Sequence, residues 1–232
     1  MNVELLERAV VALGPLLSEV TFVGGATVGQ WLSDEAAPGA RPTNDVDVVV
    51  ELASKSQLDA FGGRLRERQF REDFESGVIC RWLHGDRLDP LVVDVMPTES
   101  AILGFANVWQ ARGIPFAQRL ELPSGAAIRA IPPPYLVATK LEAFRGRGKG
   151  DFGASHDLED VISLVDGRPE LVDECRAAAS ELREYVATEV RALLAEERFV
   201  DTLGWHLRPD SASQGRLSLV VLPRLKRLSE LA

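Results

Sequence analysis

The stretch Thr43-Asn44-Asp45-Val46-Asp47-Val48-Val49-Val50 places two carboxylates one residue apart at the head of a run of valines. Successive side chains of a β-strand point to opposite faces, so Asp45 and Asp47 are expected to share one face, opposite the valines at 46, 48 and 50. Two carboxylates on one face of a rigid strand can bind a hard cation such as Mg²⁺. Because this tripeptide is common in proteins, a solvated aspartate pair that closes a loop is the alternative.

The composition of the chain limits the class of protein. Its 232 residues, 46% hydrophobic and 26% charged, are enough for one large or two small globular domains. The net charge of −9 argues against a general nucleic-acid coat or a basic membrane-surface protein, but it is compatible with a local basic patch. Cys80 and Cys175 belong to no CxxC pair and are expected to be buried thiols in a reducing compartment. The sequence shows neither a signal peptide nor an apolar run that could cross a bilayer, so we expect a cytoplasmic protein without membrane contact.

A strand, a glycine turn and a helix are expected near the N-terminus, after an amphipathic helix over residues 3–17. The strand covers residues 20–23, Gly24-Gly25-Ala26-Thr27 follows, and residues 28–33 are helical. Glycines allow the backbone to approach a ligand closely, and a helix N-terminus offers N–H groups to a phosphate. A simple tight turn is the alternative for this segment.

A third aspartate lies in a later predicted strand. Strands are expected over residues 78–83 and 91–96, and Asp94 is flanked by valines in the second of them. A buried carboxylate without a partner is costly. We therefore expect Asp94 either to share a cation with Asp45 and Asp47 or to bind local N–H or basic groups.

The second half of the chain has a helical pattern. After a hairpin over residues 116–131, Pro132-Pro133-Pro134 interrupts the chain and begins a helix. The pattern predicts an α+β protein with two domains, residues 1–131 and 132–232, and a core that contains Trp82, Trp109 and Trp205. The helices expected after the prolines cover residues 134–144, 156–165, 169–184, 186–197 and 222–231, with a polar loop at 208–216.

The chain is expected to contain, in order, a strand, Gly24-Gly25, a helix, the Asp45/Asp47 strand and the Asp94 strand. This order resembles the nucleotidyltransferase fold of the DNA polymerase β superfamily. The resemblance implies a mixed sheet with flanking helices, and a Mg²⁺-dependent transfer, with Mn²⁺ as an alternative, from an NTP substrate. Cations would neutralise the triphosphate, and no covalent residue is needed. The resemblance assigns Asp45, Asp47 and Asp94 to the metal, and Gly24, Gly25 and Thr27 to the nucleotide. Ala26 stands where the family often has Ser or Thr.

Two later segments narrow the resemblance. They are similar to motifs of the AbiEii/MenT-type nucleotidyltransferases, which are mostly toxins of toxin–antitoxin or phage-defence pairs. The two segments are Lys140-Leu141-Glu142-Ala143-Phe144-Arg145 and His156-Asp157-Leu158-Glu159-Asp160-Val161. The resemblance implies that Lys140 contacts the nucleotide and that Asp157 orients either Lys140 or the substrate. Asp160, one helical turn later on the same side, would also contribute to nucleotide binding. The helical domain would then complete the NTP site. The acceptor would be RNA, at a tRNA 3′ end, and an antitoxin protein would be a partner.

The sequence leaves several functions open. Arg145, Arg147 and Lys149 alternate with glycines and form either an RNA-holding patch or a solvated loop. A related enzyme could instead modify a small hydroxylated molecule such as an antibiotic. A catalytically silent nucleotide-binding or partner-binding module is the third alternative, and the intact aspartate triad argues against it. A metal phosphohydrolase would need more histidines than the three in this chain.

Overall fold

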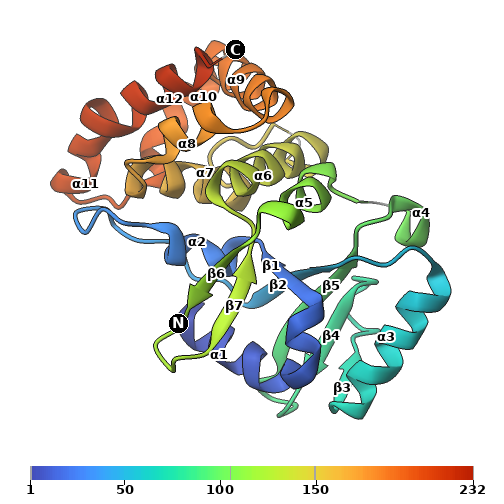
Figure 1. Cartoon of the computed structure of the whole chain (residues 1–232). Helices are drawn as coiled ribbons and strands as arrows, with labels where there is room; N and C mark the ends of the chain where they lie inside the picture. Colours follow the sequence, from blue (N-terminus) through green and yellow to red (C-terminus); the bar gives the residue numbers. More distant parts are fainter. Residues whose placement is uncertain (1, 105, 149, 232) are drawn as a thin grey trace. The chain divides into compact units, whose positions relative to one another are not determined.

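The computed structural model describes residues 2–104, 106–148 and 150–231, which form two compact units. One unit comprises Met1–Gln30 and Pro42–Pro132, and the other comprises Trp31–Arg41 and Pro133–Ala232. The predicted α+β class is confirmed, since the first unit contains one mixed sheet and the second is helical (Figure 1). The segment Trp31–Arg41 belongs to the helical unit although it precedes the Asp45 strand.

The sheet of the first unit has seven strands in the spatial order β3-β4-β5-β2-β1-β7-β6. The pairs β2–β5 and β1–β7 are parallel, and the other pairs are antiparallel. The strands are β1 (Val20–Val23), β2 (Asp45–Val50), β3 (Phe70–Glu72), β4 (Arg81–His84), β5 (Leu91–Pro97), β6 (Gln118–Glu121) and β7 (Ala127–Ala130). The aspartate-bearing strands β2 and β5 are therefore adjacent and have neighbours on both sides.

Strand β2 has the two-faced character that its sequence predicts. Val46, Val48 and Val50 are buried, whereas Asp45 and Asp47 on the other face remain partly exposed. Burial of each valine side chain contributes about 1.5–3 kcal/mol. Trp82 on β4 shares the valine face through its register partner Val93, and it packs against α3 near Gly62.

Helices of the first unit contact this sheet, α1 at β2 and β5 and α3 at β3. The expected helix over residues 3–17 ends at Leu13, because Gly14 has a φ of +53° and Pro15 lacks an N–H group. Ser54 caps α3 as expected, accepting a hydrogen bond from the Gln57 N–H. The elements are α1 (Asn2–Leu13), a 3₁₀ helix (Gly14–Glu19), α2 (Gly25–Trp31), α3 (Lys55–Glu67), α4 (Ser100–Leu103), α5 (Val108–Gly113) and a second 3₁₀ helix (Ile114–Phe116).

The helical unit differs from the prediction in its second half. The expected helix over residues 169–184 is interrupted between Ala177 and Ser180, and the expected polar loop contains a helix whose N-cap is Asp210. Trp205 is 72% exposed, so its predicted place in the core is wrong. The elements are α6 (Pro133–Arg147), α7 (His156–Gly167), α8 (Leu171–Ala177), α9 (Ser180–Ala195), α10 (Glu197–Thr202), a 3₁₀ helix (Leu203–His206), α11 (Ser211–Arg216), a π-helix (Leu217–Val221) and α12 (Leu222–Ser229). Within the described ranges, every helix is too short or too polar to cross a membrane.

The turn between β1 and α2 brings the backbone against a carboxylate. Gly24 has a φ of +76°, and a Cβ built there would lie 1.8 Å from Oδ2 of Asp47. The Oγ1 hydroxyl of Thr27 donates a hydrogen bond to the Gly24 carbonyl at 2.9 Å and so closes the turn. Both the left-handed backbone and the lack of space therefore require glycine at position 24.

We expect Gly24→Ala to lower the free energy of unfolding by at least about 2 kcal/mol, because left-handed backbone costs about 1–2 kcal/mol and Asp47 must also move. The matched control is Gly125→Ala in the same unit, where φ is +82° but a Cβ would meet nothing within 4 Å. Urea denaturation followed by circular dichroism measures both losses. Equal losses would show that the close approach of Gly24 to Asp47 does not matter for stability.

Candidate active site

Three aspartates lie on one face of the adjacent strands β2 and β5. Asp45 and Asp47 are two residues apart on β2, and Asp47 is paired in register with Asp94 on β5. Asp94 is buried, and Asp45 is about one-third exposed. Thr43 orients Asp45, because its Oγ1 donates a hydrogen bond to Asp45 Oδ1 at 2.8 Å. The structure thus brings together the three carboxylates that the sequence predicts as a group.

Arg81, the first residue of β4, belongs to the same site. It is paired in register with Asp94, so its side chain lies on the carboxylate face. Its Nε and Nη2 donate to the two oxygens of Asp94 at 2.9 and 2.8 Å, and Nη2 also donates to Asp45 Oδ2 at 3.1 Å. The hydrogen bonds to Asp94 hold the pKa of Arg81 well above its usual range, although burial opposes this shift. Asp94 therefore binds a basic group, which is one of the two arrangements expected from the sequence.

Sequence reasoning missed Arg81 for a clear reason. An aspartate between valines signals that some partner exists, but it does not say which residue supplies it. That choice depends on the antiparallel register of β4 and β5, which the pattern of Val78 to Leu83 leaves undetermined.

The carboxylates suit a divalent cation in their chemistry, since Mg²⁺ and Mn²⁺ prefer oxygen ligands. In this structure, both oxygens of Asp94 and one oxygen of Asp45 accept hydrogen bonds from Arg81. Across the part of the chain that the structure describes, no group of three or more Asp, Glu, His or Cys side chains is arranged to hold a metal ion. The donors fit Mg²⁺ or Mn²⁺ in kind, and Arg81 is the cation that the fold itself provides for them.

Cys80 precedes Arg81 and is a buried free thiol, as expected from the sequence. Burial, followed by the negative charges of Asp94 and Asp47, raises the pKa of Cys80 to about 12. The thiol is therefore protonated at neutral pH, and it is a poor nucleophile beside the carboxylates. Cys175 is also a buried free thiol.

The predicted phosphate-binding turn lies beside these carboxylates. Val23 at the end of β1 is paired in register with Asp47, and Gly24 follows it directly. Ala26 and Thr27 are fully buried, and the Thr27 hydroxyl donates to the Gly24 carbonyl. The turn thus places glycine backbone next to Asp47, and the Thr27 side chain supports the turn from within. Gly25 begins α2.

A second group of predicted residues comes together inside the helical unit. Lys140 on α6 lies with its Nζ 2.6 Å from Asp160 Oδ2 and 3.3 Å from Asp157 Oδ1, both on α7. All three side chains are buried. A buried charge is stable only when it is paired, so these contacts tie α6 to α7.

Two arginines complete this ion cluster. Arg41 donates to both oxygens of Asp160 at 3.0 and 3.3 Å, and Arg147 donates to both oxygens of Asp157 at 2.9 Å. Burial alone would raise the pKa of Asp157, but the hydrogen bonds from Arg147 and the charge of Lys140 outweigh it and lower that pKa. Sequence reasoning missed Arg41, because nothing in the pattern of the loop before the Asp45 strand marks this residue.

Two of the predicted RNA-holding residues, Arg145 and Arg147, lie in the last turn of α6, and each pairs with a carboxylate. Arg145 pairs with Glu189 on α9 at 3.1 Å, whereas Arg147 turns to Asp157 on α7. Lys149 lies outside the described residues. Both arginines remain largely exposed, so their outer edges face solvent.

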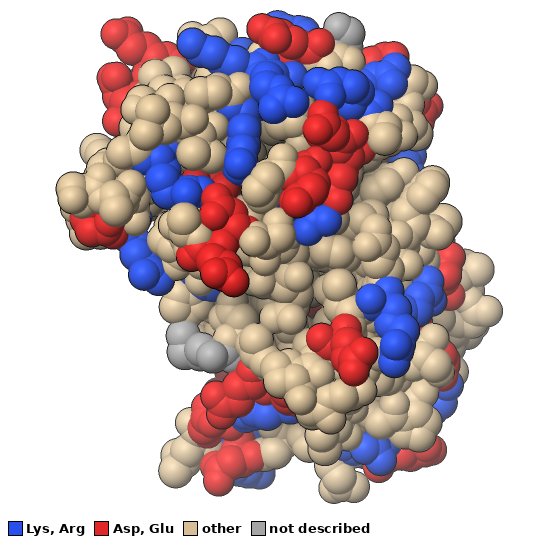
Figure 2. All heavy atoms as spheres, turned by 60° about the vertical axis from the view of Figure 1, so that its left-hand side comes forward, with Lys and Arg blue, Asp and Glu red and all other residues tan. Residues whose placement is uncertain are grey.

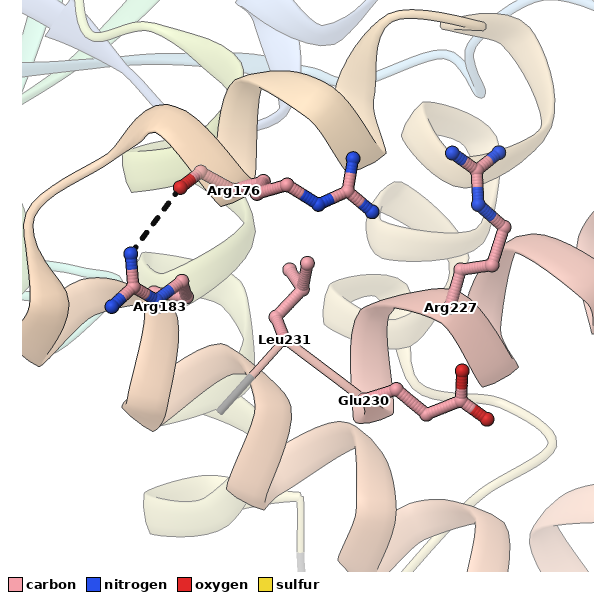
Figure 3. A pocket seen from close by; sticks show the side chains of 5 residues that line it. All are labelled: Arg176, Arg183, Arg227, Glu230 and Leu231. Atoms are coloured by element: carbon pink, nitrogen blue, oxygen red, sulfur yellow. Dashed lines mark hydrogen bonds between the residues drawn. The ribbon is translucent and has the colours of Figure 1, made fainter.

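Other positive charges of the helical unit gather near its C-terminal helix (Figure 2). Arg176, Arg183 and Arg227 line a hollow of about 290 Å³ together with Glu230 and Leu231. Their side chains surround Leu231 (Figure 3), and Arg176 and Arg227 share one carboxylate, that of Asp173. This hollow, which we term the arginine hollow, is a local positive surface on an acidic chain.

This chain is similar to a solved structure. That structure is the crystal structure of an antigenic nucleotidyltransferase-like protein from Paracoccidioides brasiliensis, with 19% sequence identity and a TM-score of 0.49. The match covers 86% of this chain and 92% of that chain. No protein-family model matches the sequence, and a search of curated proteins found no match. Any function must therefore be argued from the residues of the chain itself.

Proposed function

We propose that this chain is a Mg²⁺-dependent nucleotidyltransferase that transfers a nucleotide from an NTP to an acceptor hydroxyl. The observation that carries the proposal is the grouping of Asp45, Asp47 and Asp94 on one face of adjacent strands, beside the Gly24 turn. Three negative charges on one face favour a cation as ligand, and in this structure Arg81 supplies a positive charge to Asp45 and Asp94. The sequence resemblance to nucleotidyltransferases supports the same assignment.

The residues of the chain have separate roles in this proposal. Asp45, Asp47 and Asp94 would hold Mg²⁺ or Mn²⁺. When bound, the metal would neutralise the triphosphate and stabilise charge on the attacking and leaving oxygens. The Gly24-Gly25 backbone, which lies beside Asp47, would contact the phosphates. Lys140 would contact the nucleotide, as the sequence resemblance implies.

The acceptor in our proposal is RNA, with a tRNA 3′ end as the first candidate. The resemblance of the Lys140 and Asp157 segments to AbiEii/MenT-type toxins supports this choice, and it makes a cognate antitoxin the expected partner. Because the chain carries a net charge of −9, RNA needs local positive surfaces. The exposed arginines of α6 and the arginine hollow are the two such surfaces that we consider.

The hydrogen bonds of Arg81 favour a second candidate function, a catalytically silent module that binds nucleotides or a protein partner. A guanidinium that holds Asp45 and Asp94 leaves fewer oxygens for a metal. Incubation with each labelled NTP, Mg²⁺ and either total RNA or small hydroxylated acceptors separates these candidates. Labelled RNA supports our proposal, a labelled small molecule supports the antibiotic-type alternative, and absence of transfer supports the silent module.

The first prediction for activity concerns Asp47. We expect Asp47→Asn to reduce transfer at least about 100-fold, because the variant keeps the shape but loses a charge that the cation needs. The matched control is Asp59→Asn, an exposed aspartate on α3 that should leave activity unchanged. Transfer of labelled NTP at saturating Mg²⁺ measures the effect. Near-normal turnover of Asp47→Asn would rule out the metal assignment.

The second prediction concerns Lys140. We expect Lys140→Ala to weaken NTP binding about 10-fold or more, because its ammonium is a compact charge suited to phosphate. Asp157→Ala should also weaken binding if Asp157 orients Lys140. Calorimetric titration of the two single variants and the double variant gives the coupling between them. Additive losses would show independent action, and Arg145→Ala on the same helix controls for general loss of charge.

The third prediction concerns the acceptor. Changing Arg176, Arg183 and Arg227 together to Glu should weaken RNA binding and flatten its salt dependence by a slope of roughly one per lost phosphate contact. NTP binding should not change, because the Lys140 cluster is intact. Arg145→Glu tests the α6 surface in the same assay. If neither variant alters RNA affinity or its salt slope, both surfaces are excluded as the RNA-holding site.

A further inference from the structure

We propose that Arg81 competes with the divalent cation for Asp45 and Asp94, and that metal binding releases its guanidinium to the phosphates of the substrate. This inference rests on the proposed function, because it concerns the same three carboxylates. It assigns to Arg81 a role in binding the substrate phosphates.

The contacts of Arg81 are those of a counter-ion built into the sheet. The side chain makes a bidentate pair with Asp94 through Nε and Nη2, and its Nη2 bridges to Asp45 at 3.1 Å. Bidentate arginine–carboxylate pairs are among the strongest hydrogen-bonded pairs in proteins. Asp47, Asp94 and Arg81 are register partners across three adjacent strands, so the sheet itself holds them together.

The charges of the site allow two states, one in which Arg81 holds the carboxylates and one in which a divalent cation does. Without metal, the carboxylates of Asp45 and Asp94 need a positive partner, and Arg81 supplies one charge. A divalent cation at the same carboxylates would place two further positive charges beside the guanidinium, and like charges this close repel one another. Metal affinity is then reduced by the fraction of molecules in which Arg81 holds the carboxylates.

The released guanidinium has a suitable second partner. Arginine keeps its charge at any accessible pH, and its planar fork matches phosphate as well as carboxylate. The Arg81 side chain is 22% exposed, so it is not sealed within the core. An NTP that arrives with its metal would therefore offer Arg81 phosphate oxygens in exchange for those of Asp94.

A purely structural role for Arg81 makes a different prediction. If Arg81 only supports the sheet, its removal lowers stability and leaves metal affinity the same or weaker. If Arg81 competes with the metal, its removal strengthens metal binding even though stability falls. The two roles therefore differ in the sign of the change in metal affinity.

The test measures Mn²⁺ binding directly, by electron paramagnetic resonance, in the full chain without NTP. We expect Arg81→Gln to bind Mn²⁺ about tenfold or more tighter than the unmodified chain. Adding Asp47→Asn to Arg81→Gln should abolish this gain. The matched control is Arg64→Gln, which removes another bidentate arginine–carboxylate pair of the same unit, that with Glu19, away from the three aspartates.

The outcomes separate this inference from the proposed function. If the unmodified chain and Arg81→Gln bind Mn²⁺ equally well and Asp47→Asn does not bind it, the competition is overturned but the metal site is supported. No Mn²⁺ binding in either chain would overturn both. If Arg81→Gln does not fold, Arg81→Lys serves instead, because it keeps the charge but loses the fork. We then expect a smaller gain in affinity, and an unchanged affinity would overturn the competition.

Discussion

The structure of the first unit depends on one constraint, the parallel register that sets Asp47 on β2 beside Asp94 on β5. This register follows from burial of the valine face, because a shift by one residue would turn the valines to solvent and the aspartates to the core. It also concentrates negative charge on the other face, which a sheet cannot tolerate without a positive partner. Arg81 meets this requirement from the next strand, so the hydrophobic face and the charged face are fixed by the same pairing.

The helical unit solves a similar problem with different geometry. Asp157 and Asp160 are buried on α7. Their charges are matched by Lys140 and Arg147 of α6 and by Arg41 of the segment Trp31–Arg41. Arg216 plays the same part for Asp166 and Asp34, which lie far apart in the sequence. Such pairs are costly to break, because each leaves a buried charge without a partner. They explain why the segment Trp31–Arg41 belongs to the helices and not to the sheet.

The sequence pattern predicted those elements that are determined by residues close together in the chain. The alternation of Asp45 to Val50, the Ser54 cap and the helices that begin near Pro133 and His156 follow from residues close in sequence. The contacts of Arg81 and Arg41 follow from long-range register and packing, which no spacing reveals. The helix at Ser211–Arg216 was missed because its polar residues resemble a loop, although Asp210 is an ordinary N-cap. The exposure of Trp205 shows that a large aromatic side chain alone does not identify a core position.

The choice of arginine over lysine in these pairs bears on how the protein responds to base. Guanidinium groups keep their proton far beyond the pH at which amines lose theirs. Alkaline solution therefore leaves the pairs of Arg81, Arg147 and Arg216 intact. Acid instead affects the carboxylates. The pKa of Asp157 is lowered in the fold, so Asp157 contributes to stability at pH values above its unfolded pKa. This contribution is lost as the pH falls through the folded pKa. The arginine side of these pairs thus withstands alkali, whereas the contribution of Asp157 is lost in acid.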